Sequence, residues 1–167
     1  DVPGLDDPQR RILGATIDGV RVLNLYVVNG QEVGSDKYAH KLDWLGKVTR
    51  HIETELGAHE RLVVTGDVDI APDDRDVHDP ESWRERILCS SPERAALQKM
   101  LDLGLVDTFR LFDQEDGSFS WWDYRQAAFR RNRGLRIDLI LASKTFVETC
   151  TSSIIDKEPR QLERPSD

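Results

Sequence analysis

The amino-acid sequence predicts an α/β fold built in layers. Three features carry this prediction: two β-rich runs joined by a tight turn within residues 11–28, a long amphipathic segment over 36–57, and a continuous apolar run at 62–64. A hairpin, a helix and a buried strand in succession are typical of a sheet covered by helices. With 167 residues, 38% of them hydrophobic, the chain can bury a sizeable core. We therefore expect residues 1–167 to form a single domain.

The first elements follow from local sequence signals. Residues 11–17 and 20–28 are β-rich, and Asp18-Gly19 between them favours a type I′ hairpin turn. Apolar residues then recur at steps of three and four, which predicts a helix of about five turns. Ser35 or Asp36 can cap the start of this helix and Gly57 can stop it. Its apolar stripe comprises Tyr38, Leu42, Leu45, Val48, Ile52 and Leu56.

The second half of the chain predicts shorter elements. Residues 71–90 are polar and rich in Asp, Arg and Pro, and are expected to form a loop with at most short helical pieces. Ser90 and Glu93 form a possible capping box for a helix that ends near Gly104. A short strand or extended turn is expected at 105–109, and strands are expected at 135–142, which carries Asp138, and finally at 147–155.

Composition limits the functions that the chain can have. A net charge of −8, from 23 basic and 31 acidic residues, argues against a protein that binds polyanions over its whole surface, so any nucleic-acid contact must be local. No apolar run approaches the ~20 residues that span a bilayer. Cys89 and Cys150 have no disulfide-framework spacing, which indicates reduced thiols in a reducing compartment. The chain begins at Asp1 without Met, as expected for the interior of a longer protein.

The segment from Arg61 to Ile70 is the strongest chemical signal. Leu62, Val63 and Val64 predict a strand buried on both faces, and Gly66 lets the backbone leave it at a sharp angle. If the extended conformation continues, Asp67 and Asp69 project to the same side. Such paired carboxylates suit Mg²⁺ or Mn²⁺, which hold like charges together. The alternative is an Asp-rich turn that ends the strand and has no metal.

A second signal is a cluster of arginines that follows Trp121, Trp122 and Tyr124. Residues 125–136 contain five arginines and no acid: Arg125, Arg130, Arg131, Arg133 and Arg136. Guanidinium groups bind phosphate in a forked geometry, and aromatic side chains can stack on bases, so the segment could bind nucleic acid. The alternative is a solvated basic loop that pairs with the acidic surface.

A third signal is Asp138, which lies in an otherwise apolar run. Burial of a carboxylate there requires a partner, and a histidine is a common one. The alternative is a structural ion pair with a nearby arginine. None of the four histidines has a spacing that indicates catalysis.

Taken together, five segments resemble the exonuclease III family of DNA-repair nucleases, within the endonuclease/exonuclease/phosphatase superfamily. They occur in this order: NLYVVNG at 24–30, GDVDIAP at 66–72, FSWWDYR at 119–125, NRGLRID at 132–138 and RPSD at 164–167. The resemblance implies a four-layer α/β sandwich, incomplete here, and a divalent metal, usually Mg²⁺. It also implies incision 5′ to abasic sites in duplex DNA, with 3′–5′ exonuclease and 3′-phosphatase activity.

The resemblance also implies roles for single residues. Tyr26 matches the active-site tyrosine, Asp67 the aspartate that orients or deprotonates the attacking water, and Asp138 the partner of a catalytic histidine. Asp69 stands where the family has an asparagine that contacts the phosphate. Asp167 matches a metal-site carboxylate, which gives a metal set of Asp67, Asp69 and Asp167. DNA contacts are implied for Asn29, Trp121, Tyr124, Arg125, Arg130, Arg131 and Arg133.

Three departures from the family pattern bear on activity. The family motif continues with a histidine after Asp167, and the family has an N-terminal third that supplies an asparagine and a metal-binding glutamate. Asp69 adds a negative charge where the phosphate should lie. One alternative is therefore a non-catalytic fragment or degenerate paralogue that binds DNA without cleaving it; another is a phosphoinositide or other phosphodiester substrate. The resemblance further implies a monomer that acts on duplex DNA with abasic sites or 3′ ends, in a bacterial-type, nucleoid-associated, cytoplasmic setting and without a membrane.

Overall fold

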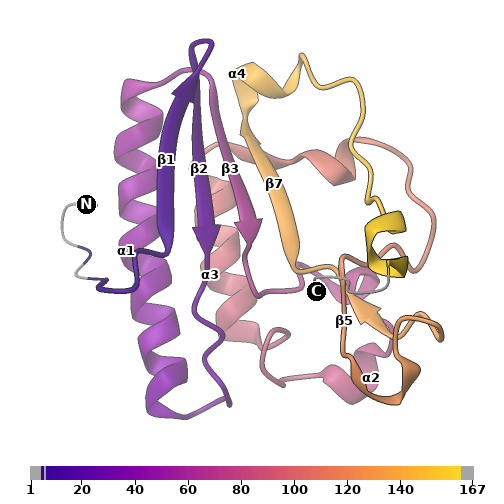
Figure 1. Ribbon diagram of the computed structural model, residues 1–167. Coiled ribbons are helices and arrows are strands. Elements are labelled where there is room, and N and C mark those ends of the chain that lie inside the picture. The colour runs from indigo at the N-terminus through magenta and orange to yellow at the C-terminus, as the bar shows by residue number, and fades with distance from the viewer. Residues whose placement is uncertain (1–4, 6, 163–167) are drawn as a thin grey trace.

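A five-stranded mixed sheet with helices on one face forms the body of the molecule. In the computed structural model, which describes residue 5 and residues 7–162, the strands lie in the order β1-β2-β3-β7-β4. Figure 1 shows β1, β2, β3 and β7 side by side. Only β2 and β3 are parallel neighbours; the other pairs are antiparallel. The strands are β1 (Ile12–Ile17), β2 (Val20–Tyr26), β3 (Leu62–Asp67), β4 (Leu105–Asp107) and β7 (Asp138–Ser143). The predicted α/β class is confirmed.

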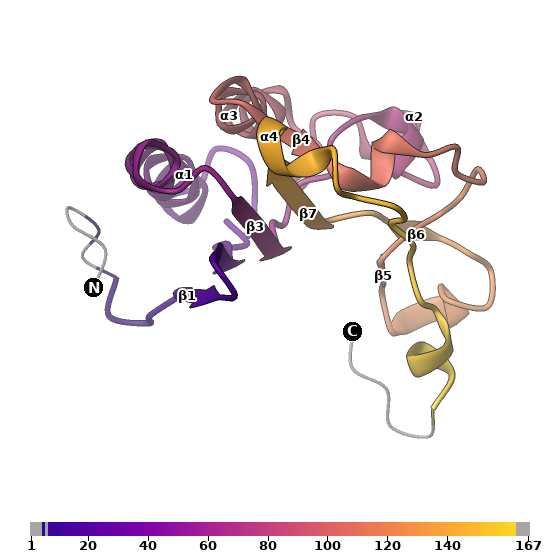
Figure 2. The ribbon, with the colours of Figure 1, turned by 90° about the horizontal axis from the view of Figure 1, so that it is seen from above.

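Two helices cover the sheet from the same side (Figure 2). They are α1 (Asp36–Ala58) and α3 (Ser91–Asp102). Ser35 caps α1 by accepting a hydrogen bond from the amide of Tyr38, and Ser90 and Glu93 form the predicted capping box of α3. Gly57 does not end α1: it lies inside the helix, and the cap is His59. The packing of α1 against the strands carries the helix past its glycine.

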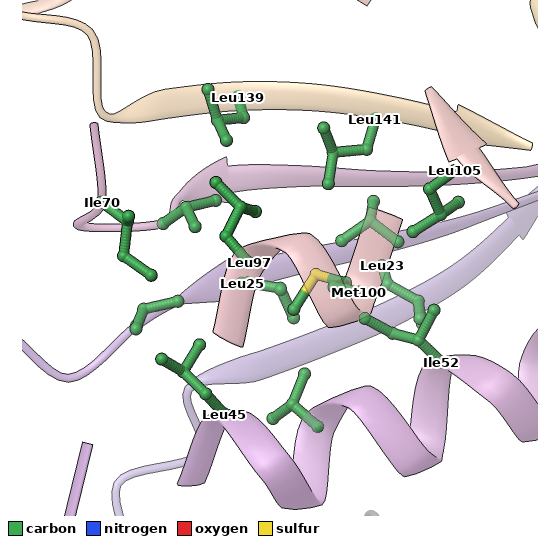
Figure 3. Packing of buried hydrophobic residues seen from close by; sticks show 14 of the residues in the cluster. Leu23, Leu25, Leu45, Ile52, Ile70, Leu97, Met100, Leu105, Leu139 and Leu141 are labelled. Atoms are coloured by element: carbon green, nitrogen blue, oxygen red, sulfur yellow. The ribbon is translucent and has the colours of Figure 1, made fainter. Parts of the chain in front are cut away.

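The core lies between this face of the sheet and the two helices (Figure 3). Alternate residues of the strands point toward the helices, so Leu23 and Leu25 meet Leu45 and Ile52 of α1, and Leu141 lies across the cluster. Each such side chain contributes about 1.5–3 kcal/mol when fully buried. The cluster comprises Leu23, Leu25, Val27, Trp44, Leu45, Val48, Ile52, Leu62, Val64, Val68, Ile70, Leu97, Met100, Leu105, Leu139 and Leu141.

The opposite face of the sheet exposes apolar side chains. Leu13, Ile17 and Ile140 are 69%, 60% and 49% exposed, and Val63 of β3 is only half-buried. The expectation that β3 is buried on both faces is therefore wrong for the described residues, because α1 and α3 both lie on one side. A layered sandwich would cover this second face with another sheet.

Shorter elements fill the polar half of the chain. They are η1 (Asp74–Asp76), α2 (Pro80–Trp83), η2 (Thr108–Leu111), β5 (Trp121–Trp122), η3 (Arg125–Ala127), β6 (Gly134–Leu135), α4 (Lys144–Val147) and η4 (Glu158–Gln161), with β5 and β6 paired as a small second sheet. The strand expected at 147–155 is wrong: α4 ends there, and residues 150–157 have no regular structure. The β-branched residues of this segment lie along the surface, and Ile154 is 80% exposed.

No helix among the described residues is long and apolar enough to cross a membrane.

Candidate active site at the ends of three strands

Three of the predicted site residues lie side by side on neighbouring strands. Tyr26 ends β2 and pairs in register with Asp67, the last residue of β3. Asp67 in turn pairs with Asp138, the first residue of β7. Neighbouring strands lie about 4.8 Å apart, and directly opposed residues point to the same face. A tyrosine and two carboxylates from distant parts of the chain therefore form one row where these three inner strands of the sheet end or begin.

A glycine allows the strands to meet so closely at this row. Gly66 has a φ of +122°, and a Cβ at this position would collide with the carbonyl oxygen of Leu25 on β2. The expected role of Gly66 is therefore confirmed in part: it provides a special backbone conformation, but β3 continues through it to Asp67.

Asp67 is held in an environment that opposes its ionisation. Burial and the nearby carboxylates of Asp69 and Asp138 raise the pKa of Asp67 to about 7. Its Oδ1 accepts one hydrogen bond, of 3.1 Å, from the amide of Asp69. An aspartate with a pKa near neutrality can take up and release protons at physiological pH.

Asp69 does not continue the strand, contrary to the expectation from the sequence. Its φ is +55°, so the chain turns into the left-handed region directly after Val68. Asn and Asp are the non-glycine residues most often found there, which explains why the backbone accommodates an aspartate at position 69. Burial raises the pKa of Asp69, whereas Lys41 and a hydrogen bond with the Asn29 side chain lower it. The two aspartates still lie close together, but through a turn.

Tyr26 and Asn29 open onto a cleft of about 580 Å³ that also reaches Asp69. Tyr26 is 58% exposed, and the guanidinium of Arg11 lies over its ring at 5.4 Å. Lys37 and His40 from the first turns of α1 line the same cleft. The positive charges of Arg11 and Lys37 can attract an anionic substrate toward the strand ends.

Asp138 is exposed, so the expectation of a carboxylate buried inside an apolar strand is wrong. It opens β7 instead of lying within it. The hydroxyl of Ser120 accepts hydrogen bonds from the amides of Ile137 and Asp138, both at 3.1 Å, and so fixes the start of the strand. The proposed structural pairing with a nearby arginine is not seen for Arg136, which binds Asp76 and Asp107.

The arginine segment forms a separate lobe with its own aromatic core. Trp122 packs edge-on against Phe129 at 4.9 Å, together with Phe119 and Ala128. Trp122 Nε1 donates to Asn132, which fixes the turn before β6. Of the aromatic residues expected to contact DNA, Trp121 is half-buried, while Tyr124 is exposed and carries the Arg160 guanidinium over its ring at 4.5 Å.

The arginines themselves face solvent. Arg130, Arg131 and Arg133 are exposed and form no ion pair with any described residue, whereas Arg125 lies 3.5 Å from Asp123. A basic loop that simply neutralised the acidic surface would show such pairs. Arg136 differs: it is 1% exposed and forms buried ion pairs with Asp76 and Asp107, at 2.6 and 2.7 Å. Four of the five arginines therefore face solvent, and Arg136 has a structural role.

The donor chemistry of the strand ends fits a hard divalent cation. Asp67 and Asp69 supply carboxylate oxygens, and burial, followed by the negative charges of Asp69 and Asp138, raises the pKa of Asp67. No group of three His, Cys, Asp or Glu side chains in residues 5 and 7–162 could hold a metal ion. A complete ligand set needs further oxygens, and Asp167, the third expected ligand, lies outside the described residues.

Two residues near the site were not anticipated from the sequence. Ser120 gave no signal, because a single serine in a loop is common. Lys41 could have been found: it follows Tyr38 by three positions and precedes Leu45 by four, which places a charged side chain on the buried stripe of α1.

Comparisons with known proteins identify the family of the chain. The family model "Endonuclease/Exonuclease/phosphatase family" matches residues 1–167. Exodeoxyribonuclease III of Haemophilus influenzae is 34% identical over 97% of this chain and 65% of its own length. The 3′ phosphatase NExo from Neisseria, solved with a product DNA hairpin, is 46% identical with a TM-score of 0.97, over 100% of this chain and 65% of that one.

An AP endonuclease from Archaeoglobus fulgidus gives 34% identity and a TM-score of 0.89, over 98% of this chain and 65% of that one. The chain thus spans slightly less than two thirds of the length of each of these relatives. The chain belongs to the Endonuclease/Exonuclease/phosphatase family, on its exonuclease III and abasic-site endonuclease branch.

Proposed function

We propose that the natural protein is a metal-dependent DNA-repair phosphodiesterase. It incises duplex DNA 5′ to abasic sites and also has 3′–5′ exonuclease and 3′-phosphatase activity. One observation carries the proposal: Tyr26, Asp67 and Asp138 stand in register on three adjacent strands. The names of the relatives, an exodeoxyribonuclease, a 3′ phosphatase and an AP endonuclease, support the same chemistry.

The chain's own residues can activate water and bind the phosphate. Asp67 takes a proton from the water that attacks the phosphorus. Tyr26, at the mouth of the cleft, donates its phenolic hydrogen to a phosphate oxygen. Asn29, which lines the same cleft, positions that phosphate. Asp138 holds a partner cation or histidine beside Asp67, because a second carboxylate in that place attracts positive charge.

Asp67 and Asp69, together with Asp167, would hold Mg²⁺ or Mn²⁺. When bound, such an ion neutralises the carboxylates and stabilises negative charge on the phosphoryl and leaving oxygens. The extra charge of Asp69 then no longer repels the substrate.

The arginine segment would hold the DNA backbone beside the strand ends. The exposed guanidinium groups of Arg130, Arg131 and Arg133 contact the phosphates of the DNA. They provide a local positive surface on a protein whose net charge is −8. Trp121 and Tyr124 would contact the strand at the lesion. An abasic nucleotide lacks stacking, so it is extruded or bent at lower cost than an intact one. That difference would give lesion selectivity.

Nicking of an abasic duplex tests the proposal. The protein as it is naturally made is incubated with a labelled duplex that carries one abasic site, with Mg²⁺ or with EDTA. We expect a single nick 5′ to the site with Mg²⁺ and none with EDTA. Metal-independent nicking would defeat the scheme. Tight, salt-dependent binding without any nick would instead favour a non-catalytic protein that binds DNA.

A phosphatase assay on a phosphoinositide, with and without added DNA, distinguishes the third alternative from a DNA substrate. Phosphatase activity that DNA does not inhibit would favour the phosphoinositide.

A further inference from the structure

Lys41 is a fully buried cation directly behind the candidate site. Its side chain is 0% exposed, in the second turn of α1, at a position where an apolar residue would be expected. An ammonium group has three hydrogens to donate. Lys41 Nζ has three acceptors: the carbonyl oxygens of Asn29, at 3.2 Å, and Asp69, at 2.7 Å, and the Glu93 carboxylate, at 2.5 Å. All its donors are therefore used.

Two of these acceptors belong to the two loops that carry site residues. Asn29 lies in the loop after β2, and Asp69 lies in the turn after β3; neither loop is held by strand pairing at that point. The loop after β2 also rests on the lysine stem, since a Cβ on Gly30 would lie 3.0 Å from Lys41 Cδ. Lys41 is thus the point where both loops are tied to α1.

The third acceptor connects these loops to a second helix. Glu93 also accepts from the amides of Leu88 and Ser90 and from the Ser90 hydroxyl, which in turn lies 2.7 Å from the Tyr38 hydroxyl. A network of fully satisfied polar groups is rigid in a buried environment. The network therefore joins α1, the start of α3 and both site loops.

Stability alone does not explain a charged pair at this place. A buried ion pair contributes little compared with well-packed apolar residues of the same volume, because both charges lose their hydration. An apolar residue at position 41 would fill the space, but it could not bind the carbonyl groups of Asn29 and Asp69. The hydrogen bonds to the loops are what only the lysine supplies.

We propose that Lys41 is a positioning residue: its ammonium group fixes the loops of Asn29 and Asp69 at the strand ends, so that the Asn29 amide meets the phosphate, and the Asp69 carboxylate the cation, in one geometry. The inference rests on the proposed cleavage of DNA for its catalytic part. Its structural part, the fixing of the two loops, does not depend on the reaction.

The test uses a charge-neutral double variant in the naturally made protein. Lys41→Met alone would leave Glu93 buried and unpaired and could unfold the chain, so Lys41→Met is combined with Glu93→Gln. Lys47→Met is the matched control, because Lys47 lies on the same helix in an ion pair with Asp43 at 2.8 Å, with its side chain 36% exposed. Nicking rates at saturating abasic duplex and amide hydrogen exchange are measured well below the melting temperature of each variant.

We expect the double variant to melt cooperatively and to have a kcat for nicking about 10- to 100-fold lower than that of the wild type. Its amides should exchange faster at residues 28–31 and 68–70, besides any change at Leu88 and Ser90, whose amides donate to Glu93. Lys47→Met should match the wild type in both readouts. Nicking at the wild-type rate, or slow nicking with unchanged exchange in the two loops, would overturn the positioning role. If the wild type itself does not cleave DNA, the proposed function fails, and loop exchange alone decides whether Lys41 fixes the loops.

Discussion

Asp67 and Asp138 stand opposite each other across the antiparallel pairing of β3 and β7. Two carboxylates in this relationship repel each other, and Asp69, in the turn after β3, adds a third negative group. A protein built only for stability would place a neutral or opposite partner here. The arrangement is understandable where a cation and a phosphate complete the site.

The contribution of Asp67 to the stability of the metal-free protein should fall as the pH rises from about 4 to about 7. The pKa of Asp67 is about 7 in the folded chain and close to its ordinary value of 3.8 in the unfolded chain, so the folded state binds the proton more tightly. The stabilisation is complete below pH 4 and is lost by the time the pH passes 7. Urea unfolding in EDTA at several pH values measures it. Asp67→Asn should remove this part of the slope, and an unchanged slope in that variant would refute the assignment.

Single replacements in the arginine segment should weaken DNA binding in a salt-dependent way. Arg130→Ala, Arg131→Ala and Arg133→Ala should each lower the slope of log affinity against log salt concentration by about 1, because each phosphate contact releases about one counterion. Fluorescence anisotropy with a labelled duplex measures the slope. Arg50→Ala, at an exposed position of α1, is the control and should leave it unchanged. Equal slopes for all four variants would show that the arginine segment does not contact the phosphates of the DNA backbone.

Arg136→Met should strongly destabilise the fold. The guanidinium of Arg136 binds both Asp76 and Asp107 in the interior, and its loss leaves their charges without this partner. Removal of one member of a buried ion pair costs about 3–5 kcal/mol, and Arg110, which also binds Asp76, offsets part of this. Chemical denaturation measures the change. Arg75→Met breaks an exposed pair with Asp73 and should have no effect on unfolding; similar midpoints for both variants would contradict the account.

A polypeptide of only these 167 residues should be unstable or self-associate. Leu13, Ile17 and Ile140 leave an apolar surface on the sheet face opposite the helices, with β1 as an open edge. Leu13→Lys combined with Ile17→Lys should shift the polypeptide toward monomer in analytical ultracentrifugation. A cooperative melt of an unmodified monomer would show that this face needs no cover.

Much of the fold follows from local sequence signals. The Asp18-Gly19 turn, the Ser35 cap and the Ser90–Glu93 capping box each involve neighbouring residues, so the sequence alone defines the hairpin and the two helices. The failures are of another kind. Gly57 did not stop α1, and the β-branched run at 147–155 did not form a strand, because tertiary contacts decide whether a weak local preference is realised.

The candidate site was predictable in its members but not in its geometry. Spacing suggested that Asp67 and Asp69 project together, whereas the positive φ of Asp69 brings them near each other through a turn. Tyr26 and Asp138 lie on either side of Asp67, an arrangement that depends on the register of strands more than a hundred residues apart in the chain, which local patterns do not contain. Lys41 binds the backbone carbonyl groups of Asn29 and Asp69. Because every residue has such a group, the sequence does not indicate which ones the lysine binds.

The most direct measurement compares Asp67→Asn with Asp43→Asn in the naturally made protein, by nicking of an abasic duplex in Mg²⁺. Asp43 pairs with Lys47 on the surface of α1, so it is a matched aspartate away from the strand ends. We predict that Asp67→Asn nicks at least about 100-fold more slowly while it melts no lower than the wild type, because a base is lost and a repulsion is relieved. Asp43→Asn should nick normally. Full nicking activity in Asp67→Asn would contradict the account.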